Sequence, residues 1–147
     1  IRQSLVGSEM CIRDRTGHLV FATLHTSTAI GTIERIIGTF PTEQQSHARV
    51  ALSEVFSGVI AQTLLPRREG GRVAAFEILV GSHAVSHLIR EGKSSQLASM
   101  MEVGQQAGNR LLNRELVQLV RSGTVDQSAA LLKAVNKDDF IRRLQRP

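Results

Sequence analysis

The chain has 147 residues, of which 41% are hydrophobic and 21% charged, a balance typical of one soluble globular domain. Its formal net charge of +5 suits nucleic acid, acidic lipid or nucleotide phosphate, but only 3% of residues are aromatic, which disfavours a base-stacking surface. No apolar run reaches the roughly 18–20 residues of a membrane span, and a single cysteine excludes a disulfide framework. These features favour a cytoplasmic protein.

The first fifteen residues stand apart from the rest. The stretch L-V-G-S-E-M-C-I-R-D at residues 5–14 can be back-translated into a string that resembles a transposase adapter used to prepare sequencing libraries. We therefore interpret residues 1–15 as non-native and leave them out of the predicted fold, as one would an expression scar. A genuine but divergent N-terminus is the alternative.

The first credible elements are a strand and two helices. Residues 19–24 are a short apolar run with β-branched and aromatic members, which predicts a buried strand. Isoleucines at helical spacing predict a helix over residues 28–37, with Ser27 or Thr28 as its cap. Pro41 ends it, since the residue before a proline avoids the helical region. Thr42 and Gln45 have the spacing of a capping box, so a second helix follows to about residue 59.

A β-hairpin and a run of helices come next. Residues 60–65 and 72–80 are strand-like and flank a proline and a Gly-Gly pair, which are turn residues. After Gly81 the pattern predicts helices over residues 84–91, 96–103, 109–121 and 126–134, with Ser82 and Asp126 as caps, and a last basic helix from Asp138. Four glycines fall where helices should end: Gly92, Gly104, Gly108 and Gly123.

Glu77 interrupts the second strand of the predicted hairpin. A buried carboxylate is costly unless it is paired, so we expect a cationic partner, either Arg72 or Arg35. His25 follows the predicted strand 19–24, at the end where open α/β sheets bind their ligands. An imidazole there can donate to a phosphate oxygen, but spacing alone favours a structural histidine.

Three stretches resemble one known family. T-G-H-L-V-F-A-T-L-H-T-S at residues 16–27 resembles the His box of the secretion ATPase superfamily, the motors of type IV pili and type II secretion. G-R-V-A-A-F-E-I at residues 71–78 is similar to a strand of the twitching-motility (retraction) ATPases, with Phe76 where the family has His. L-I-R-E-G-K at residues 88–93 is similar to half of the retraction helix A-I-R-N-L-I-R-E, but Val85, Ser86 and His87 depart from the other half.

The resemblance, which spans about residues 16–135, implies an α/β fold. Residues 16–81 would be the late strands and helices of a RecA-like P-loop ATPase core, and residues 82–147 an all-α C-terminal helical domain. Members of the family form homo-hexamers, use ATP and Mg²⁺, and work in the cytoplasm, peripheral to the bacterial inner membrane. Their partner is the inner-membrane pilus platform protein; neither nucleic acid nor an integral membrane segment is implied.

The resemblance also assigns roles to residues of this chain. It implies that His25 senses the γ-phosphate of the nucleotide, and it makes a weaker case for His18. Thr23 and Thr26, with Ser27, either hydrogen-bond the nucleotide region or cap the next helix. Four residues of the retraction helix would couple ATP hydrolysis to pilus disassembly: Leu88, Ile89, Arg90 and Glu91.

The phosphate-binding parts of such a motor are missing from this sequence. No G-x-x-x-x-G-K-[ST] loop and no acidic strand to hold Mg²⁺ occur in it. Phosphoryl transfer depends on such positioning and charge groups, so we expect the chain alone not to hydrolyse ATP. Three alternatives stay open: part of a pilus-assembly or type II secretion ATPase, a helical binding module, and a basic nucleic-acid binder with salt-dependent affinity.

Overall fold

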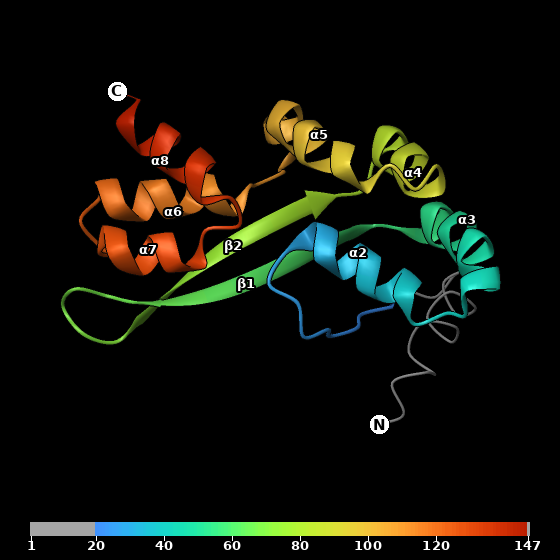
Figure 1. The fold of residues 1–147 in the computed structure, drawn as a ribbon, viewed down its shortest axis with the longest axis horizontal. Helices are drawn as coiled ribbons and strands as arrows, with labels where there is room; N and C mark the ends of the chain where they lie inside the picture. The colour runs from blue at the N-terminus through green and yellow to red at the C-terminus, as the bar shows by residue number, and fades with distance from the viewer. Residues whose placement is uncertain (1–19, 147) are drawn as a thin grey trace.

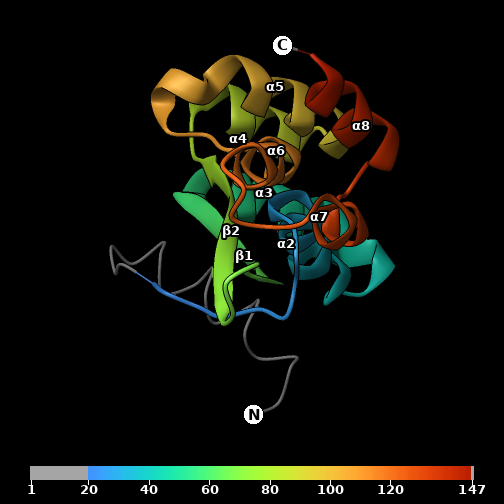
Figure 2. The same cartoon turned by 90° about the vertical axis from the view of Figure 1, so that its left-hand side faces the viewer.

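The computed structural model describes residues 20–146 of the chain. It is an α/β fold in which one long β-hairpin crosses the molecule and the helices pack along it (Figure 1). The helices between residues 29 and 90 lie toward one end of the hairpin, and those between residues 112 and 145 lie toward the other (Figure 1). In the view turned by 90°, the hairpin again lies along the edge of the helical layer (Figure 2).

The hairpin confirms the prediction for residues 60–80. Strands β1 (Gly58–Pro66) and β2 (Arg72–Val80) are antiparallel and pair from Gly58 with Val80 to Pro66 with Arg72. Both glycines of the turn have positive φ, 90° at Gly70 and 77° at Gly71, which side chains rarely adopt. Alternate residues face the helices, as a half-buried sheet requires: Ala61, Thr63, Leu65, Ala75, Glu77 and Leu79.

A first hydrophobic core lies where the hairpin meets four helices. These are α2 (Ala29–Gly38), α3 (Gln45–Val55), α4 (His83–Arg90) and α5 (Leu97–Val103). The core is built from Ile33, Ile37, Leu79, Ile89, Leu97 and Met101, each at most 2% exposed, and from further apolar residues around them. Short 3₁₀ turns precede α3 (Thr42–Gln44) and α5 (Ser94–Gln96), and a third (Gly104–Ala107) follows α5.

A second core lies toward the hairpin turn. Helices α6 (Leu112–Arg121), α7 (Gln127–Lys133) and α8 (Lys137–Gln145) surround the fully buried Phe140 and pack on Leu65 and Ala75. Asn113, 7% exposed, hydrogen-bonds the backbone of the connection between α7 and α8. Its Nδ2 donates to Asn136 O at 2.8 Å, and its Oδ1 accepts from Val135 N at 3.1 Å. A buried amide with these partners fixes the connection instead of destabilising the core.

The free edge of β2 is joined to the segment before α6. Ile78 N donates to Arg110 O at 2.9 Å, and Arg110 N donates to Ile78 O at 2.8 Å. Next to this bridge, the buried Asn109 accepts a 2.7 Å hydrogen bond from Val80 N through its Oδ1. We expected Asn109 or Arg110 to begin the helix; instead Arg110 forms a bridge to β2, Asn109 binds β2 through its side chain, and α6 starts at Leu112.

Two helix starts follow the sequence closely and three do not. The Thr28 side chain caps α2 by accepting from Gly31 N, and Ser82 caps α4 by accepting from Val85 N. The capping box at Thr42 is wrong, because Thr42 opens a 3₁₀ turn and the Gln45 side chain donates to Phe40 O. Asp126 stands at the predicted N-cap position of α7, but its side chain makes no cap bond and pairs with Arg68. Helix α8 starts at Lys137, one residue before the predicted Asp138, and Asn136 caps it.

The strand predicted over residues 19–24 is wrong over residues 20–24, which form no strand. A strand needs a hydrogen-bonding neighbour, and among the described residues this segment has none, because the sheet consists of β1 and β2 alone there. Leu19 lies outside the described residues. The predicted division at residue 81 stays a prediction, and both cores combine residues from either side of it.

Candidate functional site

The segment that carries His25 runs along the surface before α2 begins. The His25 side chain is exposed, as are Thr23 and Phe21, the latter at 89%. Within residues 20–146 no hydrogen bond to the His25 imidazole is present. The second predicted histidine, His18, lies outside the described residues.

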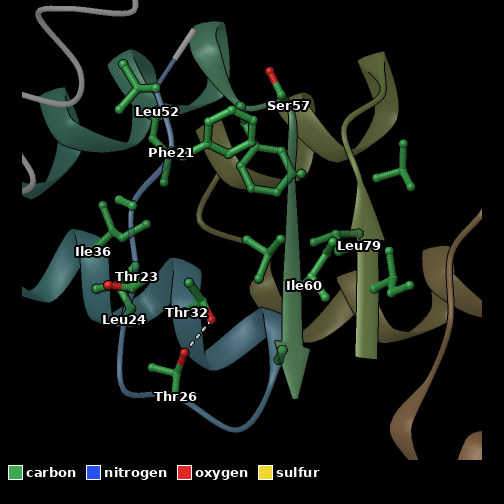
Figure 3. Close-up of a pocket in the computed structure, with 18 of the residues that line it drawn as sticks. Phe21, Thr23, Leu24, Thr26, Thr32, Ile36, Leu52, Ser57, Ile60 and Leu79 are labelled. Carbon is green, nitrogen blue, oxygen red and sulfur yellow. Dashed lines mark hydrogen bonds between the residues drawn. The ribbon is translucent and has the colours of Figure 1, made fainter. Parts of the chain in front are cut away.

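An open groove of about 700 Å³ separates this segment from β1 (Figure 3). One wall is the segment itself, from which Phe21 projects toward β1; the other is β1, whose Ile60 is 70% exposed. Leu52 of α3, Ile36 of α2 and Leu79 of β2 also contribute to the lining. The groove is therefore largely apolar, and it meets solvent at the side chains of Phe21 and Ile60.

Threonine hydroxyls fasten the end of the segment to α2. The hydroxyls of Thr26 and Thr32 share a 2.6 Å hydrogen bond (Figure 3). Thr32 Oγ1 also donates to Thr28 O at 2.8 Å. Thr26 is half-buried, whereas Thr23 stays exposed. The last residues after His25 are thus held to the first turn of α2, while the residues before it are not held in a sheet.

Glu77 joins this part of the chain to α6. Its Oε1 accepts a hydrogen bond from Ala29 N at 2.8 Å, and its Oε2 accepts one from Leu112 N at 3.3 Å. The expected pairing with Arg72 or Arg35 is wrong. The two helix starts supply partial positive charge and unpaired amides, so they take the place of a cation.

Burial makes the charged form of Glu77 less favourable than it is in water. Burial raises the pKa of the carboxyl above its ordinary value, although the hydrogen bonds from the Ala29 and Leu112 amides oppose that rise. Glu77 is only 5% exposed, and its carboxyl forms no ion pair within residues 20–146. The carboxylate is therefore held by backbone dipoles alone.

The raised pKa makes a prediction about stability. A carboxyl that binds its proton more tightly when folded favours folding below its ordinary pKa, about 4.3, and this contribution is lost as pH rises through the raised pKa. The free energy of unfolding of the wild type, minus that of Glu77→Gln, should thus fall as pH rises from about 4 to 7.5. Urea unfolding at several pH values measures it; a difference that stays constant or grows with pH contradicts the assignment.

The four residues expected to couple hydrolysis to movement divide into two pairs. Leu88 (8% exposed) and Ile89 (1%) lie in the first core with residues of α2, whereas Arg90 and Glu91 are exposed at the end of α4. Arg90 Nε donates to Ser53 Oγ of α3 at 3.2 Å, which ties the two helices together. Of the four, only Arg90 and Glu91 have side chains exposed to solvent.

Sequence reasoning missed the buried amides that organise these elements. Asn109 precedes α6, and Asn113 lies in its first turn. Isolated asparagines near a helix start suggest caps, but these two side chains bind backbone groups of other elements. A usable signal existed for Glu77: Leu111, the residue before α6, cannot cap a helix, so the first amides of α6 needed an acceptor from elsewhere.

Two further findings concern metal and membrane. The residues from 20 to 146 hold no group of three or more His, Cys, Asp or Glu side chains able to bind a metal ion. Over the same range, every helix is too short or too polar to cross a bilayer.

In sequence and in fold, the chain is similar to ATPases of type IV pili. The chain is 41% identical over 140 residues to the type IV pilus retraction ATPase PilT of Pseudomonas aeruginosa, covering 95% of this chain and 39% of that protein. It is 44% identical over 126 residues to the twitching motility protein of Neisseria gonorrhoeae, covering 85% and 34%. A crystal structure of the pilus retraction motor PilT with bound ADP superposes with a TM-score of 0.83 at 39% identity, covering 97% of this chain and 40% of that one.

The chain is thus a homologue of part of the pilus retraction ATPases, and it spans less than half the length of these relatives. No family model matches it. The alignment with the Pseudomonas protein covers 95% of the chain and so extends into residues 1–15. The interpretation of those residues as non-native stays a prediction.

Proposed function

We propose that this chain is part of a hexameric, ATP-hydrolysing motor that powers retraction of type IV pili and twitching motility. The observation that carries the proposal is the match over 97% of the chain to the ADP-bound pilus retraction motor. Identities of 41% and 44% to a retraction ATPase and a twitching motility protein support it. The motor would work in the cytoplasm, against a platform protein of the inner membrane.

Within this motor, His25 would sense the γ-phosphate of ATP. Its exposed imidazole can donate to a phosphate oxygen, and the exposed Thr23 offers a hydroxyl beside it. Thr26 would act on the nucleotide side by holding the segment to α2, and His18 is the weaker candidate. Because the sequence has no P-loop, the cradle for the phosphates, the Mg²⁺ ligands and the group that activates water would come from the remainder of the protein.

The remainder would complete a RecA-like core on the open side of β1. Two-stranded sheets are marginal alone, and the face of the hairpin away from the helices carries Ile60 (70% exposed) and Leu64 (46% exposed). The strand-like segment at residues 20–24 lies across the groove from β1. Further parallel strands entering this groove would give the segment a neighbour and cover the apolar side chains.

Helix α4 would pass the motion to the pilus machinery. Leu88 and Ile89 anchor the helix in the core that α2 shares, while Arg90 and Glu91 face outward. A displacement of α2 on the nucleotide side would therefore move α4, and its exposed charged end would contact a neighbouring subunit or the platform protein.

A chimera tests the proposal. Residues 16–146 of this chain would replace the matching part of the Pseudomonas retraction ATPase, which supplies the P-loop. We expect the chimera to hydrolyse ATP, with turnover that requires the P-loop lysine of the donor half, and the chain alone to show none. A folded chimera without nucleotide-dependent turnover would refute the proposal.

A further inference from the structure

Two helix starts that are distant in sequence converge on one buried carboxylate. Glu77 lies in the middle of β2; its two oxygens accept from Ala29 N, where α2 begins, and from Leu112 N, where α6 begins. The first amide precedes the hairpin in the chain and the second follows it. One side chain therefore fixes the relative position of two elements that share no loop.

Neither helix start has another acceptor for these amides in the described part of the chain. In α2, the Thr28 side chain is occupied by Gly31 N at 3.0 Å. In α6, the residue before the helix is Leu111, whose side chain cannot accept. The first amides of a helix have no partner within it, and leaving one buried and unpaired is costly. Both starts depend on Glu77.

Glutamate fits this position in charge and in reach. Its two oxygens serve two donors at once and its charge complements two helix dipoles of the same sign. Glutamine has one acceptor oxygen, and its NH₂ group would face an amide N–H. Aspartate keeps the charge but is shorter by one methylene, so its oxygens cannot occupy both of the present positions.

The two helix starts belong to different working parts of the chain. Ala29 is the first residue of α2, and the Thr26–Thr32 hydrogen bond holds the segment after His25 to this helix. Leu112 begins the group of helices around Phe140, next to the Ile78–Arg110 bridge. We propose that Glu77 is a positioning residue that couples them: when the His25 segment moves, the start of α2 moves, and the shared carboxylate carries the shift to the start of α6. The link to nucleotide rests on the proposed function, whereas the coupling of the two helices does not.

The first test uses the unmodified full chain. In an NMR titration, the amide signals of Ala29 and Leu112 should shift with one common midpoint, above the ordinary range of a glutamate, because one carboxyl contacts both. Other charged groups on the surrounding elements are Glu34, Arg35, Arg72, Arg110, Arg114, Glu115 and Arg121; none of them pairs with Glu77 within residues 20–146. Repeating the titration with Glu115→Gln removes the other acid in the first turn of α6. Different midpoints, or a Leu112 signal that does not titrate, would overturn the coupling.

The second test asks whether a disturbance at α2 reaches α6. Thr28→Ala removes the side-chain cap of α2 without touching Glu77. With Glu77 present, this change should speed hydrogen exchange of the Leu112 amide by about threefold or more; in the Glu77→Gln background it should leave that amide unchanged. Glu115→Gln is the matched control and should preserve the response. An exchange response of the same size with and without the Glu77 carboxylate would overturn the proposal.

The two proposals fail in different ways. Lack of ATP hydrolysis in the chimera would refute the motor assignment, while amide exchange would still decide the coupling. If Glu77→Gln does not fold, the common titration midpoint of the unmodified chain decides it alone. In an active chimera, Glu77→Gln should lower kcat more than it changes KM, because the residue positions His25 and does not touch nucleotide.

Discussion

Ile89→Ala should lower the free energy of unfolding of this chain by about 2–5 kcal/mol, the usual cost of removing a large buried aliphatic side chain. Ile89 is 1% exposed and packs in the first core with Leu88, Val85 and residues of α2. Leu88→Ala should act in the same direction. Since small domains are stable by only about 5–15 kcal/mol, the double variant should populate unfolded chain. Urea unfolding followed by circular dichroism measures each loss.

Glu91→Gln is the matched control on the same helix. Glu91 is exposed and pairs only loosely with Lys93, at 4.0 Å, so its substitution should change the free energy of unfolding by less than about 0.5 kcal/mol. If Ile89→Ala proved as mild as Glu91→Gln, α4 would not be packed as described. A twitching defect from Leu88 or Ile89 variants would thus reflect lost packing, whereas one from Glu91 variants would report on a partner contact.

His25→Ala should reduce the ATP turnover of the chimera by about 10²-fold, the scale found when one preorganised donor to a transition-state oxyanion is removed. The fold should be unaffected, because His25 is exposed and makes no hydrogen bond within residues 20–146. Steady-state hydrolysis gives kcat, and urea unfolding of the same variant gives stability.

His47→Ala supplies the comparison for His25. It removes another exposed histidine, on α3, outside the motif at residues 16–27. We expect turnover within about twofold of the unmodified chimera, since surface substitutions of this kind perturb little. Equal turnover in the two variants would remove the γ-phosphate role from His25, even if the chimera itself is active.

The elements that could be predicted from the sequence are those whose cause is local. The hairpin follows from alternating residues around Gly70 and Gly71, which tolerate positive φ. The starts of α2 and α4 follow from Thr28 and Ser82, whose side chains reach amides three residues on. In each case the residues that decide the structure are neighbours in the chain.

The features that could not be predicted depend on distant partners. Residues 20–24 have the composition of a strand, but hydrogen-bonding neighbours decide whether a strand forms, and the described chain provides none. A carboxylate in an apolar strand indicated that Glu77 needs a partner; that the partners are two helix starts depends on how α2 and α6 pack on the hairpin. The candidate site was likewise predictable only as His25 in a motif, not as an exposed group beside a groove.

Twitching motility tests the central claim most directly. The chimera would be expressed in Pseudomonas aeruginosa that lacks its own retraction ATPase, and the twitching zone would be measured beside that of the native enzyme. If this chain is part of a retraction motor, the chimera restores a zone and its His25→Ala variant does not. A chimera that hydrolyses ATP but restores no zone would contradict the assignment to pilus retraction.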